Sequence, residues 1–160
     1  MTPALAALAR RHFELAQVLH CNGSSVDLQG NHRNSPLHPA AYHGDCEMVQ
    51  ILLNYGVDIN VKNNDGTTPL VFALESCFSG LDPTVVRLLL DHGADLNIPK
   101  KSGTTPLHLA SQLGRIEIVR LLVERGASGG GQDTWGSTPL DLASGEHSDE
   151  IIKLLEHRAK

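Results

Sequence analysis

Histidine and cysteine are the residues of this chain that could do chemistry. The 160-residue sequence holds nine histidines and three cysteines. Such side chains bind zinc when they recur at short spacings such as His-x-x-x-His or Cys-x-x-Cys. Neither pattern occurs here. We therefore expect no metal site and no cofactor.

A cysteine nucleophile is the second chemical possibility. Cys46 follows His43 by three residues, so the two side chains could supply a thiol and its base. Such a pair also needs an orienting acid and a shaped pocket. The pattern places Cys46 on an exposed polar turn and Cys77 in an insertion, and it supplies neither requirement. Asp58 and Asp95 recur at equivalent positions, which is typical of turn-forming residues. We predict that the protein is not an enzyme.

Two of the histidines belong to a signature that repeats along the chain. It consists of Ser or Thr, then Pro, and usually Leu, and its prolines are Pro3, Pro36, Pro69, Pro106 and Pro139. Successive prolines lie 33, 33, 37 and 33 residues apart. A fixed period indicates an array of one small structural unit. Since His38 and His108 follow two of these prolines at the same distance, we expect each ring to bond to a nearby turn.

Each unit carries the pattern of two helices. The Ser or Thr before the proline predicts a helix N-cap, with proline in the first helical position. Further on, four apolar residues surround one polar residue, as Ile118, Val119, Leu121 and Leu122 surround Arg120, which indicates an amphipathic helix. A glycine then predicts the left-handed end of that helix. A connector leads from this glycine to the next proline.

The best-formed unit runs from Gly103-Thr104-Thr105-Pro106-Leu107-His108-Leu109-Ala110 to Gly126-Ala127 and resembles the ankyrin repeat. The resemblance covers essentially the whole chain. It implies an all-α ankyrin-repeat solenoid of five helix-turn-helix units, with the connectors as β-hairpin or turn fingers beside a concave face. It also implies that Asn60 and Asn97 match asparagines that are hydroxylated in some family members. Val71 departs from the pattern, because it stands where histidine is expected.

We predict that the five units form one domain over residues 1–160. The repeats span about 1–33, 34–66, 67–103, 104–136 and 137–160. The outer repeats carry His20 and Glu156 at a position where the inner repeats carry apolar residues. Because the terminal repeats of a solenoid need a polar outer face, we expect both ends of the stack to be present.

Composition limits the classes of partner. The net charge is -5 and the basic residues are scattered, so we expect no nucleic-acid binding. No apolar stretch approaches the roughly 18 residues of a membrane span, so we expect no membrane segment. An odd number of cysteines without a pairing motif favours a reducing compartment, the cytoplasm with the nucleus as the alternative. We expect a monomer.

A solenoid offers an open concave face instead of a closed pocket. The expected partner is therefore another protein or an extended peptide. The positions that the repeat pattern leaves free are the candidate partner-binding residues: Asn34, Tyr42, His43, Asn64, Asp65, Thr67, Glu75, Ser76, Lys101, Thr104, Gln112, Leu113 and Trp135. Trp135 and Tyr42 are the expected anchors, since exposed aromatic residues are common at the centre of interfaces. The alternative for Trp135 is that it folds down over the glycine-rich connector at 129–131.

Two functions remain open at this point. The first is a non-catalytic protein-protein interaction module that binds through the concave groove and the fingertips. The second is a regulatory or targeting ankyrin segment of a larger enzyme or signalling protein.

Overall fold

The computed structural model describes residues 34–76, 83–145 and 147–156. Predicted repeat one and most of the insertion in repeat three, including Cys77, lie outside these residues. The described chain contains seven helices and no strand. The helices are α3 (Leu37–Tyr42), α4 (Cys46–Asn54), α5 (Pro69–Ser76), α6 (Thr84–Asp91), α7 (Pro106–Gln112), α8 (Ile116–Glu124) and α9 (Ser148–Glu156). None of them is long and apolar enough to cross a membrane.

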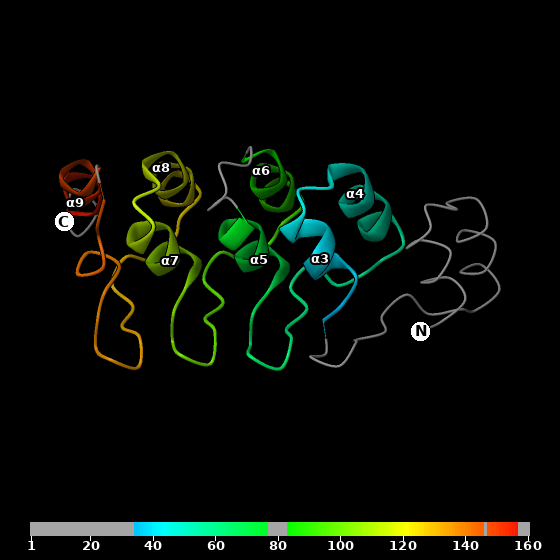
Figure 1. The fold of residues 1–160 in the computed structure, drawn as a ribbon, viewed down its shortest axis with the longest axis horizontal. Helices are drawn as coiled ribbons and strands as arrows, with labels where there is room; N and C mark the ends of the chain where they lie inside the picture. Colours follow the sequence, from blue (N-terminus) through cyan, green and yellow to red (C-terminus); the bar gives the residue numbers. More distant parts are fainter. Residues whose placement is uncertain (1–33, 77–82, 146, 157–160) are drawn as a thin grey trace.

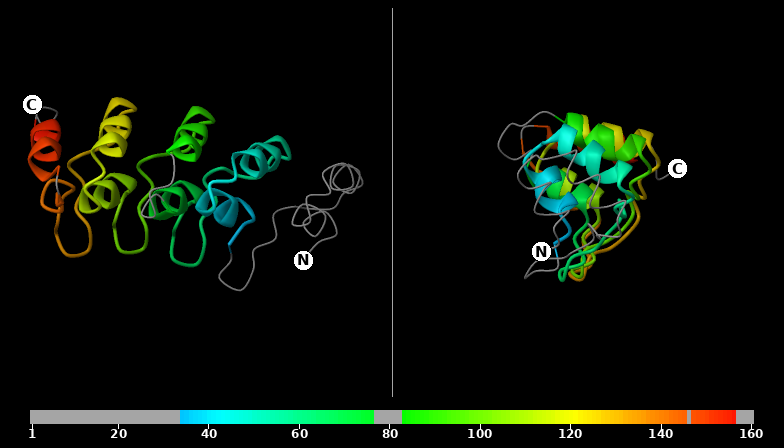
Figure 2. Two further views of the ribbon diagram at one scale, coloured as in Figure 1. Left: turned by 45° about the horizontal axis from the view of Figure 1, so that its top comes forward. Right: turned by 90° about the vertical axis from the view of Figure 1, so that its right-hand side faces the viewer.

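The helices stack in two rows. Figure 1 shows α3, α5 and α7 in an inner row, above the loops that project below them, and α4, α6, α8 and α9 in an outer row. In the view along the stack in Figure 2, successive units overlie one another. Each inner helix packs against its own outer helix, and α5 also packs against both α3 and α7. The predicted all-α repeat solenoid is therefore confirmed.

The core lies between neighbouring units. The apolar stripe of the outer helices is buried there, and its fully buried members are Val49, Leu52, Val86, Leu89, Val119, Leu122 and Ile151. The leucine after each proline joins them from the inner row, as Leu37, Leu70 and Leu107. One continuous cluster results, because no unit can bury its apolar face alone.

The ends of the outer helices follow the predicted pattern. Gly56, Gly93 and Gly126 come directly after the capping residues of α4, α6 and α8, with φ of 75°, 87° and 96°. These angles lie in the left-handed region that glycine adopts at low cost.

The helix starts differ between units. In α7 the prediction is confirmed, because the Thr105 hydroxyl accepts from the backbone N–H of His108 and also bonds to its ring Nδ1 at 2.7 Å. In α5 the proline begins the helix as predicted, but the predicted cap is wrong, because the buried Thr68 hydroxyl has no hydrogen-bond partner among the described residues. The physical reason is Val71, which stands where α7 has His108 and offers no ring nitrogen.

The predicted first helix of the fifth unit is also wrong. Residues 139–142 form a turn and no helix. Gly145, with φ of 87°, comes six residues after its proline, whereas Gly44 and Gly114 come eight residues after theirs. The shorter spacing leaves too few residues for a helix before the chain reverses. Just after this turn the chain contacts α7, where the Ser144 hydroxyl donates to the carbonyl oxygen of Gln112 at 2.6 Å.

The connectors project as fingers, which we name finger two (56–68), finger three (93–105) and finger four (126–138). Each tip is a tight turn closed by backbone hydrogen bonds. In finger two, Asn63 N–H donates to the Thr67 carbonyl, and Gly66 N–H donates to that of Asn63, both at 3.1 Å. Because the described residues contain no strand, the β-hairpin form of the fingers is not confirmed.

Candidate partner-binding surface

Most of the predicted fingertip residues reach the surface. Asn64 and Asp65 of finger two, Lys101 of finger three and Trp135 of finger four are exposed. They occupy the middle of the tight turns. The backbone turn itself is held from within, as Asn63 Oδ1 accepts from Asp65 N–H and Thr67 N–H at 2.9 Å each.

Two predicted partner-binding residues are buried, so their assignment is wrong. Thr67 is 3% exposed, and its carbonyl oxygen accepts from His38 Nε2 at 2.9 Å. This bond joins Thr67 to the neighbouring unit. Ser76 is 4% exposed, since it is the last residue of α5 and faces the interior.

Tyr42 keeps its predicted place on the inner row. It ends α3 and is 44% exposed. Its ring lies edge-on to the Phe72 ring of α5, with the centroids 6.3 Å apart, and edge-on to the ring of exposed His43 at 5.4 Å. Aromatic edge-to-face contacts of this kind hold a ring in position. Phe72 was not among the predicted site residues. The aromatic side chain at this position of the inner helix was the sequence feature that could have indicated its contact with Tyr42.

Trp135 is the most exposed large apolar residue of the described chain, at 75%. Its backbone N–H donates to Asp133 Oδ1 at 2.9 Å, and Asp133 is itself buried at the base of the turn. The carboxylate thus fixes the turn that carries the indole. With this exposure, the ring does not fold down over the glycine-rich part of finger four.

The remaining candidate residues differ in their exposure and in their contacts with neighbouring residues. Glu75 of α5 pairs with Lys100 of finger three at 2.8 Å, and both side chains are partly exposed. The Asn34 side chain accepts from Asn63 Nδ2 at 3.0 Å. The other three are half-buried Thr104, exposed Gln112 and half-buried Leu113, which follows α7. An ion pair at the surface contributes little to stability, so Glu75 and Lys100 remain available for a partner.

The signature histidines have a structural role, as predicted. His38 is fully buried, and its ring lies between the carbonyl oxygens of Ser35 at 3.2 Å and Thr67 at 2.9 Å. Burial lowers its pKa, against the opposite effect of these hydrogen bonds. His108 accepts from Thr105 N–H at Nδ1, so its Nε2 donates to the Ser137 carbonyl at 3.1 Å. Each ring therefore links its unit to the next finger.

Recurring asparagines make a second link that the sequence did not predict. Asn60 Oδ1 accepts from Asp95 N–H at 2.8 Å, and Asn97 Oδ1 accepts from Ser128 N–H at 2.9 Å. The recurrence of these asparagines was the available signal. The series ends in finger four, because Gly130 stands in the equivalent position and has no side chain.

Cys46, which the sequence offered only as a possible nucleophile, lies in a different place from the one predicted. Cys46 is the first residue of α4 and packs half-buried against the core, so its predicted exposure on a turn is wrong. The carboxylates of Asp58 and Asp95 accept from the backbone N–H groups of Asn60 and Asn97, which makes them turn-forming residues as predicted. In the described part of the chain, no three metal-ligating side chains gather at one place.

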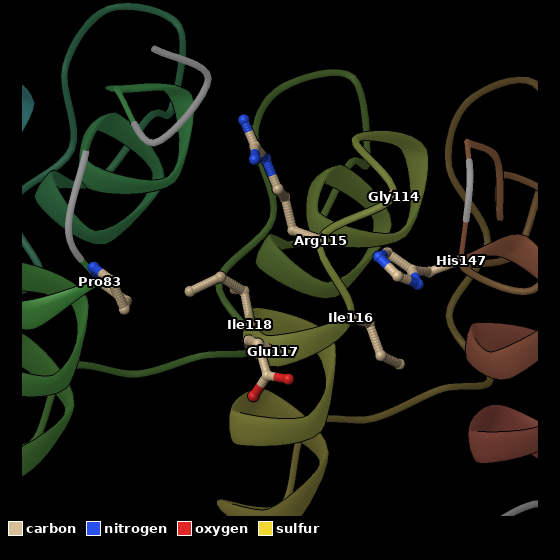
Figure 3. A pocket seen from close by; sticks show the side chains of 7 residues that line it. All are labelled: Pro83, Gly114, Arg115, Ile116, Glu117, Ile118 and His147. Atoms are coloured by element: carbon tan, nitrogen blue, oxygen red, sulfur yellow. The ribbon is translucent and has the colours of Figure 1, made fainter. Parts of the chain in front are cut away.

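Figure 3 shows a pocket where the first turn of α8 meets the neighbouring units. It is lined by Pro83, Gly114, Arg115, Ile116, Glu117, Ile118 and His147. Ile116 and Ile118 are buried and form an apolar floor. Among the described residues, the lining of this pocket includes no serine, threonine or cysteine.

Comparison with known proteins gives relatives that carry the same repeat. The chain is 39% identical over 69 residues to ankyrin repeat and SOCS box protein 5 of Bos taurus, which covers 43% of this chain and 21% of that protein. It is 35% identical over 69 residues to the probable 26S proteasome regulatory subunit p28 of Saccharomyces cerevisiae, which covers 42% and 30%. It is 51% identical over 43 residues to the probable E3 ubiquitin-protein ligase XBOS32 of Oryza sativa, which covers 27% and 9%.

These matches are partial on both sides. The aligned stretches span well under half of the relatives' own lengths, from 6% in alpha-latrotoxin-Lg1a of Latrodectus geometricus to 32% in a putative ankyrin repeat protein of Fowlpox virus. The family model described as "Ankyrin repeats (3 copies)" matches residues 4–100 and 77–160, which is almost the whole chain. With the stacked helix pairs and the recurring signature, this match shows that the chain belongs to the ankyrin repeat family.

Proposed function

We propose that this protein is a non-catalytic interaction module that binds a partner protein or an extended peptide through its inner helices and fingertips. Ankyrin repeats are in general protein-protein interaction modules. The proposal adds the face and the residues that would do the binding in this chain.

The observation that carries the proposal is the exposure of two aromatic residues. Trp135 and Tyr42 are the exposed large apolar side chains of the described residues. Both stand at positions that the repeat pattern leaves free, so the fold does not require an aromatic residue at either place. Burying exposed tryptophan and tyrosine rings against a partner is a common source of binding energy.

The two anchors lie far apart along the array. Tyr42 ends α3, and Trp135 lies on finger four, near the opposite end of the described stack in Figure 1. A partner that contacts both must extend along the row of fingers. Between them lie the polar side chains of Asp65, Lys101 and the Glu75–Lys100 pair, which would form the hydrogen-bonding rim of the interface.

The outer row of helices is a poorer binding face. On α8, Glu117 precedes Arg120 by three residues, and on α9, Glu150 precedes Lys153 in the same way. Opposite charges at this spacing are neighbours on a helix surface and neutralise each other. Arg125 of this row also pairs with Asp91 of α6 at 2.8 Å.

Quantitative affinity capture from the source cell tests the proposal. The Trp135→Ala variant should bind the captured partner at least about tenfold more weakly, as expected for an interface anchor. Its thermal midpoint should be unchanged, because the ring is mostly exposed. Tyr42→Ala should also weaken binding, and Gln50→Ala on the outer face of α4 is the matched control. A partner held equally well by the Trp135/Tyr42 double variant and by wild type would refute the proposal.

The second candidate is a regulatory or targeting segment of a larger protein. It is favoured by the lengths of the relatives, of which this chain matches only a small part. Three of these relatives are named for a SOCS box, a proteasome subunit and a ubiquitin ligase. The mass of the protein detected in the source cell distinguishes the two candidates, because a regulatory segment would appear in a chain much heavier than 17.2 kDa.

A further inference from the structure

The inner helices leave only a narrow strip of side chains uncovered. In each of α3, α5 and α7, all residues are buried except two, and these two lie three positions apart. Residues at this spacing are neighbours on one face of a helix. The three pairs follow one another along the inner row of Figure 1. We name them the inner strip: Pro39, Tyr42, Phe72, Glu75, Leu109 and Gln112.

The inner strip carries one charge. Glu75 is its only member that is ionised at neutral pH, and the other five side chains are apolar, aromatic or amide groups. A charge beside apolar groups is screened less than one surrounded by water, so it attracts an opposite charge more strongly. The net charge of -5 on the whole protein acts in the same direction over longer distances. The inner strip therefore favours a positively charged group.

The structure already places one cation on this carboxylate. Lys100 Nζ of finger three lies 2.8 Å from Glu75 Oε1, and the two side chains are 26% and 34% exposed. At the positions equivalent to Lys100, Asn63 of finger two and Asp133 of finger four instead accept backbone N–H groups of their own turns. The Lys100 side chain thus leaves its turn and reaches α5. This internal pair shows that a cation can reach Glu75 from the side of the fingers.

Two aromatic rings border the carboxylate. Phe72 precedes Glu75 by three residues in α5, and its ring lies edge-on to the ring of Tyr42, with the centroids 6.3 Å apart. The face of an aromatic ring attracts a nearby cation. The guanidinium group of arginine is planar, so it stacks on a ring while its N–H groups bond to a carboxylate. Rings and carboxylate together match arginine better than they match an apolar side chain.

We propose that the inner strip binds an arginine side chain of the partner. The guanidinium group lies against the rings of Tyr42 and Phe72 and donates to Glu75, where it takes the place of the Lys100 ammonium group. The inference rests on the proposed interaction function and adds the chemistry of the partner, which is a basic segment of a protein. It also changes the role of Tyr42, because the ring then binds a cation and is no longer only an apolar anchor.

A pair of small probes tests the charge requirement. N-acetyl-arginine amide and N-acetyl-citrulline amide have nearly the same shape, but the citrulline side chain is uncharged. In NMR titrations at equal ionic strength, the arginine probe should shift the ring signals of Tyr42 and Phe72. The citrulline probe should bind at least about fivefold more weakly, because it loses the attraction to the rings and to the carboxylate. Equal binding of the two probes would overturn the inference.

Substitutions at the internal ion pair should act in opposite directions. Glu75→Gln should weaken binding of the arginine probe at least about fivefold, because the charge is lost. Lys100→Met should strengthen it about two- to fivefold, because it removes the internal competitor of an exposed ion pair. The matched control is Glu124→Gln at the exposed end of α8, which should bind the probe like wild type. Weaker binding by the Lys100→Met variant would overturn the inference.

Further measurements separate this inference from the proposed function. Thermal midpoints of the three variants show that each is folded. Tyr42→Leu keeps an apolar side chain but removes the ring, so it should weaken binding of the arginine probe by about threefold or more. A captured partner that is lost by Trp135→Ala but held equally by wild type and by Glu75→Gln would overturn the inference and leave the proposed function standing.

Discussion

A single ring nitrogen separates a satisfied helix start from an unsatisfied one. Thr68 and Thr105 occupy equivalent positions before a proline, yet the Thr105 hydroxyl bonds to His108 and the Thr68 hydroxyl is buried without a partner. Asp141 plays the same part in the fifth unit, where it accepts from the Thr138 hydroxyl and backbone N–H, and these bonds hold its pKa below the ordinary value. The residue three places after the threonine therefore decides whether the threonine caps the unit.

Equivalent substitutions at the two threonines should have different effects. Thr105→Val should lower the free energy of unfolding by about 1 kcal/mol, since it removes a capping hydroxyl. Thr68→Val should cause no loss, because its hydroxyl already lacks a partner and a buried unpaired polar group is unfavourable. Urea denaturation of the two variants and wild type measures the difference. Equal losses at both positions would show that Thr68 is bonded after all.

The buried His38 should make stability depend on pH. Its pKa in the folded protein lies below the ordinary value of 6.5, so the unfolded chain binds a proton that the folded chain resists. The contribution of His38 to stability is therefore complete above about pH 6.5 and falls as the pH decreases below that value. In the His38→Gln variant, the free energy of unfolding should fall less steeply between about pH 7.5 and about pH 5.5. Denaturant titrations at several pH values measure the slopes, and identical slopes would contradict the assignment.

At the scale of elements, the fingers join into one row through their backbones. Lys101 and Thr134 donate to the preceding finger, while Asn60 and Asn97 accept from the following one. Loops that are bonded to each other in this way keep a fixed order and spacing. A row of fixed tips can present Trp135 and the neighbouring polar groups as one surface.

Glycines in the tips should be less replaceable than glycines at helix ends. Gly103 and Gly56 have nearly the same φ, 76° and 75°, so alanine at either position costs about 1–2 kcal/mol of backbone strain. Only at Gly103 does the added methyl group also collide with the next finger, 2.9 Å from Asp133 Cα. Gly103→Ala should therefore lower the free energy of unfolding by at least about 1 kcal/mol more than Gly56→Ala. Chemical denaturation of both variants measures this difference. Equal free energies of unfolding for the two variants would contradict the prediction.

The sequence was sufficient to predict the pairs of helices but not every element of the fold. The apolar stripe around Arg120 and the helix-ending Gly126 were visible because packing and backbone sterics impose them in every unit. The turn that replaces the expected helix after Pro139 depends on a glycine two residues early, which is a small change inside a matching repeat. Thr67 looked like a free fingertip residue, but it is buried and its carbonyl oxygen bonds to the His38 ring of the preceding unit. The pattern of a single repeat therefore does not predict the contacts between units.

At the scale of the whole molecule, stacking leaves two long faces that differ in character. The inner helices and fingertips carry Tyr42 and Trp135, whereas on the outer row Arg125, which follows α8, pairs with Asp91 of α6. The core between the units is continuous, and its side chains are used for stability. The proposed function places the partner on the inner face because exposed aromatic area remains there.

The most direct test of this account is hydrogen–deuterium exchange of the protein with and without its captured partner. Binding should slow the exchange of amides in the fingertips at 63–66, 100–103 and 133–136 and at the ends of α3 and α7. Amides of α4, α6 and α8 should exchange as they do in the free protein. Protection confined to those outer helices, with the fingertips unchanged, would contradict the account.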